Sequence, residues 1–229
     1  MHEEFLKPTE FIDSDSQAIQ EFTEKAVEDA KTPREKAVKL YYAVRDGIYY
    51  DPYRIDPTPN GFKASAILQQ GYGYCVAKAI VLAACLRSCN IPCKLHFADV
   101  RNHLTTKRLK ELMQTDTFYY HGYNDVWLDD HWIKGTPTFN LSLCEKFKVK
   151  PLDWDGASDA VFHPFDLEGR RHMEYITDHG SFADVPFDAI LNTFLTCYGD
   201  VSRHFPGGSR PTGNFEKEGE EEARDVDAG

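Results

Sequence analysis

The 229-residue sequence contains no apolar run that approaches the roughly 20 residues needed to cross a bilayer. Its first residues, MHEEFLKPTEF, carry acids where a signal peptide would carry bases, and no apolar segment follows them. We therefore expect a cytoplasmic protein that has no membrane partner.

The sequence also lacks the cluster of Lys and Arg residues that a nucleic-acid-binding surface requires. The densest basic stretch, TTKRLK, is better explained as the solvated start of a helix. The formal net charge is -11, and the last fourteen residues contribute seven acids and two bases to it. We therefore do not expect a nucleic acid as partner, and the sequence indicates no oligomeric state.

The six cysteines include no C-x-x-C pair, and the histidines that a zinc site would need do not accompany them. Because the chain is long enough to fold without disulfide staples, the cysteines are expected to be free thiols. Cys85 and Cys89 are small apolar residues on one helix face, and Cys93 begins the next element. We expect no metal and no other cofactor, and no resolving cysteine supports a redox role.

The hydrophobic content of 41% and the aromatic content of 13% are typical of a folded globular protein. Apolar residues with a period near 3.6 predict helices over residues 16–30 and 32–48, and a third from Cys75 to about Cys89. The period then falls to 2 in CKLHFADV, FYYHGYNDVWL and HWIKGTPTF, of which the last two predict an antiparallel hairpin. The fold class is therefore α+β, with helices packed on an antiparallel sheet.

Composition divides the chain into three parts. Residues 1–145 hold the predicted helices and hairpin and form the expected core. Residues 146–206 are aromatic and loop-rich, and we expect this extension to pack on the core. Residues 207–229 have the Gly, Pro and charge content of a disordered acidic tail.

Cys75 follows the stretch Gly-Tyr-Gly-Tyr and opens the third predicted helix. The unpaired N–H groups and the positive dipole end of a helix start favour thiolate over thiol, and they can stabilise an oxyanion. The alternative is that Cys75 is one more buried thiol. A nucleophilic thiol also needs a base, and His121, at the head of a strand of the hairpin, is the best placed histidine. By position alone, a structural role for His121 is equally compatible with the sequence.

The order of these motifs resembles the transglutaminase-like superfamily over roughly residues 8–140. That family has a Gly-x-Cys helix start, a helix end of the form Leu-Arg-x-x-Gly-Ile-Pro-Ala-Arg that leads into a strand, and a His-x-aromatic…Trp…Asp-x-Thr hairpin. The matching positions in this sequence are Gly73, Cys75, Leu86, Arg87, Ile91, Pro92, Lys94, His121, Tyr123, Trp132, Thr136 and Thr138. The resemblance implies a papain-type α+β fold with a Cys-His-Asp triad, and Cys75 and His121 match its first two members.

The third triad position departs from the family pattern, because Thr136 stands where the aspartate is expected. A threonine hydroxyl can accept the imidazole N–H bond, but it brings no negative charge. Asn140 is the substitute, if the strand continues regularly as far as that residue. Two further carboxylates, Asp125 and Asp130, are less well placed on the hairpin.

The segment that precedes Cys75 contributes four further residues to the expected site. Gln69 or Gln70 would supply an oxyanion donor, as a glutamine does in papain-like sites, or would simply cap a surface turn. Tyr72 and Tyr74 would line the cleft that receives the acyl group.

The resemblance implies a cysteine-dependent acyl-transfer enzyme, and it does not imply calcium dependence. Hydrolysis of an amide bond in a peptide or small amide substrate, as in a peptidase or amidase, is the preferred reaction. The alternative is a non-catalytic member of the same fold that binds a peptide or a protein, which the missing aspartate would favour.

Overall fold

The computed structural model describes residues 2–103, 105–162, 164–198 and 214–227. Its first half holds, in chain order, η1 (Glu3–Phe5), α1 (Gln17–Val27), α2 (Pro33–Gly47), β1 (Tyr49–Tyr50), η2 (Pro59–Phe62), α3 (Ala64–Gln70), β2 (Tyr72–Gly73) and α4 (Cys75–Ser88). Its second half holds β3 (Cys93–Asn102), α5 (Lys107–Met113), β4 (Thr117–Leu128), β5 (His131–Gly135), α6 (Leu141–Phe147), β6 (Met173–Phe182), α7 (Phe187–Cys197) and α8 (Phe215–Asp227). The fold is α+β, as predicted.

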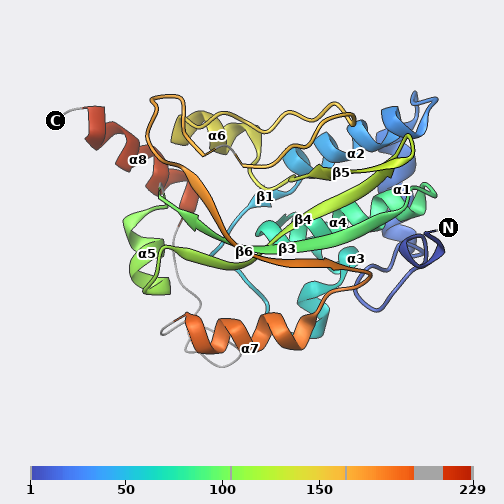
Figure 1. Cartoon of the computed structure of the whole chain (residues 1–229), viewed down its shortest axis with the longest axis horizontal. Helices are drawn as coiled ribbons and strands as arrows, with labels where there is room; N and C mark the ends of the chain where they lie inside the picture. Colours follow the sequence, from blue (N-terminus) through green and yellow to red (C-terminus); the bar gives the residue numbers. More distant parts are fainter. Residues whose placement is uncertain (1, 104, 163, 199–213, 228–229) are drawn as a thin grey trace.

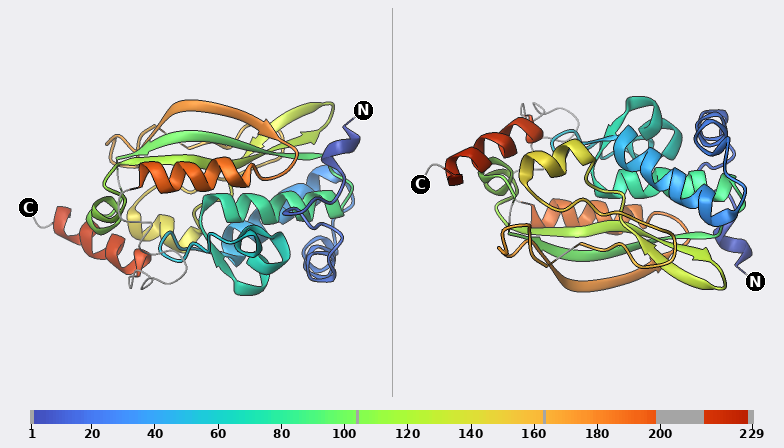
Figure 2. Two further views of the ribbon diagram at one scale, coloured as in Figure 1. Left: turned by 90° about the horizontal axis from the view of Figure 1, so that it is seen from below. Right: turned by 90° about the horizontal axis from the view of Figure 1, so that it is seen from above.

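The main sheet has the strand order β5-β4-β3-β6, and all its pairs are antiparallel (Figure 1). The predicted hairpin is confirmed, because β4 and β5 pair around a turn at Asp129 and Asp130. The short strands β1 and β2 form a separate parallel pair just before α4. Figure 2 shows α4 and α7 beneath the same face of the sheet, and both helices contact β4.

Helix α4 is the centre of the hydrophobic core. Every residue from Cys75 to Arg87 is buried, as expected for a helix that is apolar on all sides. The helix ends at Ser88, and Asn90 takes the left-handed conformation (φ 57°) before Pro92 prevents continuation. The predicted bounds of this helix are therefore confirmed to within a residue.

Lys78 is the one basic residue in the first three turns of α4, and its side chain is fully buried. Its Nζ donates hydrogen bonds of 2.7 Å to the backbone oxygens of Arg45 and Ile48, where α2 ends. Carbonyls at the end of a helix have no partner within the helix, so the ammonium group satisfies two of them. Burial lowers the pKa of Lys78 to about 7. This contact fixes α4 against α2 one turn after Cys75.

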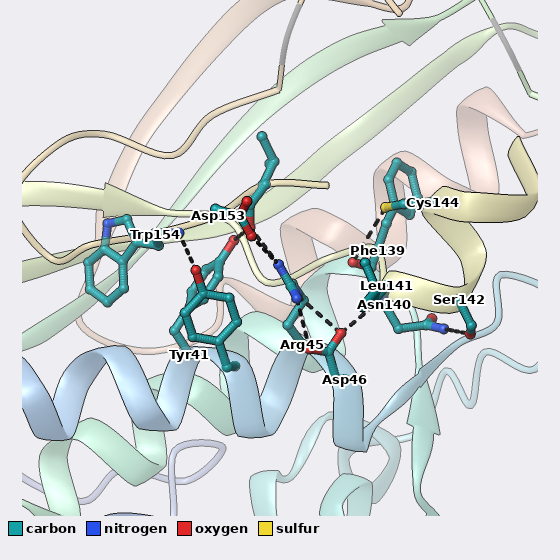
Figure 3. A network of polar contacts seen from close by, with 12 residues as sticks. Tyr41, Arg45, Asp46, Phe139, Asn140, Leu141, Ser142, Cys144, Asp153 and Trp154 are labelled. Carbon is teal, nitrogen blue, oxygen red and sulfur yellow. Dashed lines mark hydrogen bonds and ion pairs between the residues drawn. The ribbon is translucent and has the colours of Figure 1, made fainter. Parts of the chain in front are cut away.

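A network of polar contacts holds the segment after β5 against α2 (Figure 3). The Tyr41 hydroxyl lies 2.9 Å from the backbone oxygens of both Thr136 and Leu152. The Arg45 guanidinium group donates to Leu152 O and to Asp153 Oδ1. Because these bonds are buried or partly buried, they fix the path of the chain that follows the hairpin.

The predicted boundary at residue 145 is not supported by the structure. Met173–Phe182 forms β6, which pairs with β3 from Leu95 to Asn102 and is therefore a strand of the core sheet. An edge strand exposes many of its side chains, and in β6 the residues from Glu174 to Asp178 are exposed. The alternation of apolar residues that marks a half-buried strand is therefore absent from its sequence.

The predicted disorder of residues 207–229 is wrong for Phe215–Asp227, which forms α8, while 207–213 and 228–229 lie outside the described residues. Phe215 is buried and stacks on Phe147 of α6. Gly219 lies so close to the Phe147 ring that a Cβ at this position would clash with it. An acidic residue of α8 also forms an ion pair with a basic residue of α6, because Glu216 contacts Lys146.

None of the helices in the described part of the chain is long and apolar enough to span a membrane. All six cysteines are free, which confirms the prediction of thiols without disulfides.

Replacing Lys78 with Met tests the contact between α4 and α2. The two carbonyl oxygens would stay buried without a donor, so we expect the free energy of unfolding to fall by about 3 kcal/mol. Urea unfolding at pH 7 measures this change. Lys25→Met, at an exposed position of α1, is the control and should change stability by less than about 0.5 kcal/mol. Equal stability of Lys78→Met and the wild type would contradict this role for the ammonium group.

Candidate active site

Cys75 is the first residue of α4, and Tyr74 precedes it in an extended conformation. The predicted start of a helix at Cys75 is confirmed. A Cβ on Gly73 would lie only 2.6 Å from the Cβ of Ala77, so the chain enters the helix along a path that only glycine permits. The glycine is needed here for this close approach.

The start of α4 meets β4 beyond the point where β5 ends. Gly135, the last residue of β5, pairs with Asn124, so the described residues place no strand beside the preceding part of β4 on this edge. A Cβ on Gly122 would lie 3.0 Å from the Cα of Val76, which shows how closely helix and strand approach. The Gly122 N–H lies within reach of the Cys75 sulfur.

His121 therefore neighbours the Cys75 thiol along the backbone of β4. Side chains alternate along a strand, and Gly122 and Asn124 face α4, where Asn124 Nδ2 donates to the backbone oxygen of Ala79. The His121 side chain belongs to the opposite face, which we call the outer face. Its ring lies among the rings of Phe162 at 4.8 Å, Tyr123 at 6.0 Å and Tyr175 at 6.5 Å.

The His121 ring is buried, and its Nε2 has no hydrogen-bond partner among the described residues. No hydrogen bond joins it to Cys75 within the same part of the chain. Phe162 packs directly on the ring, so the imidazole is covered in this state. The structure therefore brings the backbone next to His121 to the thiol, but it shows no contact between the thiol and the imidazole.

Thr136 follows β5 and is buried, and its Oγ1 has no partner among the described residues. Only its backbone oxygen is fixed, by Tyr41. The hydroxyl is therefore available to an imidazole N–H, but the structure does not form that bond.

The regular strand that would have carried Asn140 towards His121 does not exist, because β5 ends at Gly135. Asn140 is instead the residue that precedes α6. Its Oδ1 accepts the backbone N–H of Tyr50. Its Nδ2 donates to the hydroxyl of Ser142, as Figure 3 shows. With its amide engaged in this way, Asn140 makes no contact with the imidazole of His121.

The two hairpin carboxylates are not partners of His121 either. Asp125 accepts hydrogen bonds from Ser181 and Lys134 and contacts His96 Nδ1 at 2.9 Å. Asp130 lies in the turn with a left-handed backbone conformation.

The residues expected to complete the site lie in different environments. Gln69 and Gln70 are exposed at the end of α3, and Gln70 Nε2 donates to the backbone oxygen of Tyr72, as in the surface-turn alternative. The Tyr72 ring stacks beneath the Arg54 guanidinium group. Tyr74 alone is buried beside Cys75, and its hydroxyl has no partner among the described residues.

The pKa values correct the expectation of a resting thiolate. Burial raises the pKa of Cys75 to about 11, although the N–H groups of Gly122, Val76 and Cys75 itself act in the opposite direction. Burial lowers the pKa of His121 to about 3. At neutral pH the site therefore holds a thiol and a neutral imidazole, because the loss of water outweighs the helix start.

No sequence motif marks three further tyrosines of this region as site residues, namely Tyr50, Tyr175 and Tyr198. Burial raises the pKa of each phenol, and the neighbouring Cys75 sulfur raises it further. They come from β1, β6 and the end of α7, which are far apart in the chain. Among the described residues no three His, Cys, Asp or Glu side chains form a cluster suited to a metal ion.

The burial of neutral His121 predicts a pH dependence of stability. Its pKa is lower in the folded state than the ordinary 6.5, so the unfolded state binds the proton first as the pH falls. Stability is therefore lost between about pH 6.5 and pH 3, by at most about 1.4 kcal/mol per pH unit. We expect His121→Leu to lose this part of the wild-type slope in urea unfolding at several pH values. His131→Leu, in the exposed hairpin turn, is the control, and parallel slopes for His121→Leu and the wild type would contradict the burial of a neutral ring.

One solved structure shows a similar fold, and two others match more weakly. A protein from Cytophaga hutchinsonii, provisionally assigned as a cysteine protease, matches 81% of this chain with 16% identity and a TM-score of 0.50. The chain spans about half of that protein, namely 48% of its length. A provisionally assigned protease from Parabacteroides distasonis matches 56% of the chain and 25% of its own length, with 17% identity and a TM-score of 0.38. Red sea bream transglutaminase matches 76% of the chain and 35% of its own length, with 18% identity and a TM-score of 0.38.

No curated protein matches the chain. The family model of the transglutaminase-like superfamily matches residues 20–137, which is just over half of the 229 residues. This match includes Cys75, His121 and Thr136, and it ends where the segment after β5 begins. The chain therefore belongs to the transglutaminase-like superfamily.

Proposed function

We propose that this protein is a cysteine-dependent acyl-transfer enzyme that hydrolyses an amide bond. The observation that carries the proposal is the position of Cys75 at the first residue of α4, with its sulfur beside the backbone of His121–Gly122. The N–H groups of Gly122, Val76 and Cys75 surround the sulfur. A buried structural cysteine would not require this arrangement of helix start and strand.

The proposed reaction has two stages. The thiol of Cys75 attacks the amide carbonyl as its proton passes to the imidazole of His121, and a C–S bond forms. The proton then goes to the leaving amine as the C–N bond breaks, which leaves a thioester. A water molecule that gives its proton to His121 attacks the thioester, and the acid and the free thiol are released. N–H groups at the helix start stabilise the oxyanion of both tetrahedral intermediates.

The neutral state of both groups is compatible with this mechanism. Burial opposes a thiolate alone and an imidazolium alone, because neither charge would be solvated. A proton that passes from sulfur to imidazole creates both charges together, and their attraction is strong where water is absent. The base is thus effective only when the substrate is in place.

Access to the site requires a change in the covering residues. Cys75 is 6% exposed and His121 is 3% exposed, and the Phe162 ring lies on the imidazole. The bound substrate would therefore displace Phe162, and this contact would protect the site from water between turnovers. We place the enzyme in the cytoplasm, which its six free cysteines support.

A binding module is the second candidate function. In its favour, none of the described carboxylates contacts His121, and Thr136 Oγ1 is unpaired. In that case a peptide would bind at the site without reacting.

Replacing Cys75 with Ala distinguishes the two functions. We expect turnover of a mixed library of fluorogenic peptide amides to fall by about three orders of magnitude or more, because no other group can form the thioester. Cys197→Ala, which removes a partly exposed cysteine of α7, is the control and should retain wild-type activity. Equal activity of Cys75→Ala and the wild type would rule out the mechanism. Binding of library peptides without turnover by either protein would favour the binding module.

Two substitutions test the position of Thr136. Thr136→Asp should preserve or raise activity if this residue orients His121, because a carboxylate stabilises the cationic imidazole. Thr136→Val keeps the shape but removes the hydroxyl, and we expect it to lower kcat by about tenfold. The measurement is kcat as a function of pH. A folded Thr136→Val variant with wild-type kcat would assign the orienting role elsewhere.

A further inference from the structure

A groove of about 390 Å³ lies on the outer face of the sheet, next to the candidate site. Tyr123 and Tyr175 line it and also contact the His121 ring. These two contacts place the groove beside the imidazole of His121. Its volume is at the lower end of the range for small-ligand pockets, about 300 to 1,000 Å³.

Tyr123 presents a polar group to this groove. It is only 4% exposed, and its hydroxyl makes no hydrogen bond to any described residue. Burial raises its pKa, as do the neighbouring acidic groups Tyr175, Asp178, Asp125 and Asp159. A hydroxyl that faces a groove without a protein partner can form a hydrogen bond with a bound ligand.

The charges around the groove do not balance. Lys134 Nζ lies 3.1 Å from Asp125 Oδ1, and this pair cancels. Asp159 accepts the backbone N–H of Lys134 with Oδ1, but none of the described cations pairs with its carboxylate. The side chain of Asp178 is 69% exposed, and its Oδ1 contacts His96 Nε2 at 2.7 Å. Burial lowers the pKa of His96, but its contacts with Asp125 and Asp178 outweigh this and raise it above the usual value. With His96 protonated, Asp159 and Asp178 leave a net charge of about -1 at the groove.

The remaining walls are apolar. Ala98 lies at the base with a side chain of one carbon, and Val161 and Ile176 line the sides. Tyr175 and Tyr123 add aromatic rings, at 6.3 Å from each other and nearly perpendicular. Apolar and aromatic walls, together with the Asp159 carboxylate and the exposed carboxylate of Asp178, match a side chain that has an aliphatic stem and a cationic end.

We propose that this groove is a specificity subsite that binds a basic side chain, Lys or Arg, of a peptide substrate close to the amide that Cys75 attacks. That the bound peptide is a substrate rests on the proposed acyl transfer, whereas the groove and its charges do not depend on it. The aliphatic stem packs between Val161 and Ile176, and the cationic group pairs with Asp159 and Asp178. The Tyr123 hydroxyl accepts a hydrogen bond from the same group.

Binding is measured on the full-length protein by NMR of labelled Ile and Val methyl groups, so no turnover is needed. The probes are Nα-acetyl-lysine methylamide and its norleucine and glutamate counterparts. We expect the lysine probe to shift the Val161 and Ile176 methyl signals and to bind at least about threefold more tightly than norleucine. Equal binding of lysine and norleucine, tighter binding of glutamate, or shifts confined to other methyl groups would overturn the proposal.

Asp159→Asn is the first variant, because the asparagine Oδ1 can still accept the Lys134 N–H. It should reduce the preference for lysine over norleucine by about threefold and leave norleucine binding unchanged. Glu174→Gln neutralises a carboxylate of β6 that does not line the groove, and it should leave the preference intact. An unchanged preference in Asp159→Asn, or an equal loss in Glu174→Gln, would exclude this pairing.

The two proposals fail in different ways. If Cys75→Ala has wild-type activity while the lysine probe still binds through Asp159, acyl transfer by Cys75 is wrong and a groove for cations remains. If Cys75 is essential but lysine binds no better than norleucine, only the subsite is wrong.

Discussion

The close approach of α4 to β4 is the constraint on which the rest of the site depends. Gly122 of β4 allows it, because a Cβ there would meet Val76, and Gly73 lets the chain turn into α4 without a clash with Ala77. The buried ammonium of Lys78 fixes the same helix from the other side. Because the helix is buried along its length, its first residue cannot shift without disturbing the core. The position of the thiol is therefore set by packing.

The same packing explains the electrostatics. A helix start brings N–H groups to the sulfur, but the burial that holds the helix also removes water, and this second effect is larger. Four tyrosines close around the sulfur and keep the surroundings neutral: Tyr50, Tyr74, Tyr175 and Tyr198. A resting ion pair would need either a nearby carboxylate or solvent. The substitution of threonine for the family's aspartate is compatible with a site that stays uncharged at rest.

Glycine and proline signals and the hydrophobic periodicity of the sequence predict a part of the fold correctly. The glycine turn before Cys75, the stop at Pro92 and the alternation in the hairpin gave α4 and β4 near their observed bounds and the start of β5, which ends earlier than predicted, at Gly135. Strand β6 could not be predicted, because its exposed edge carries no alternation. Helix α8 could not be predicted, because composition does not reveal that Phe215 stacks on Phe147 and that Gly219 packs closely against the same ring. The engagement of Asn140 with Tyr50 likewise depends on the end of β5, which no local pattern marks.

The strand order also has a consequence for folding. β3 and β4 are close in sequence, whereas β6 must pair with β3 across the whole segment that contains β4, β5 and α6. Contacts between distant residues form slowly, because the loop between them must close first. In an intermediate with β3, β4 and β5 in place but without β6, Tyr175 would not yet have reached the outer face of the sheet. The imidazole of His121 would then lack one of the rings that surround it, so its enclosure would be completed late in folding.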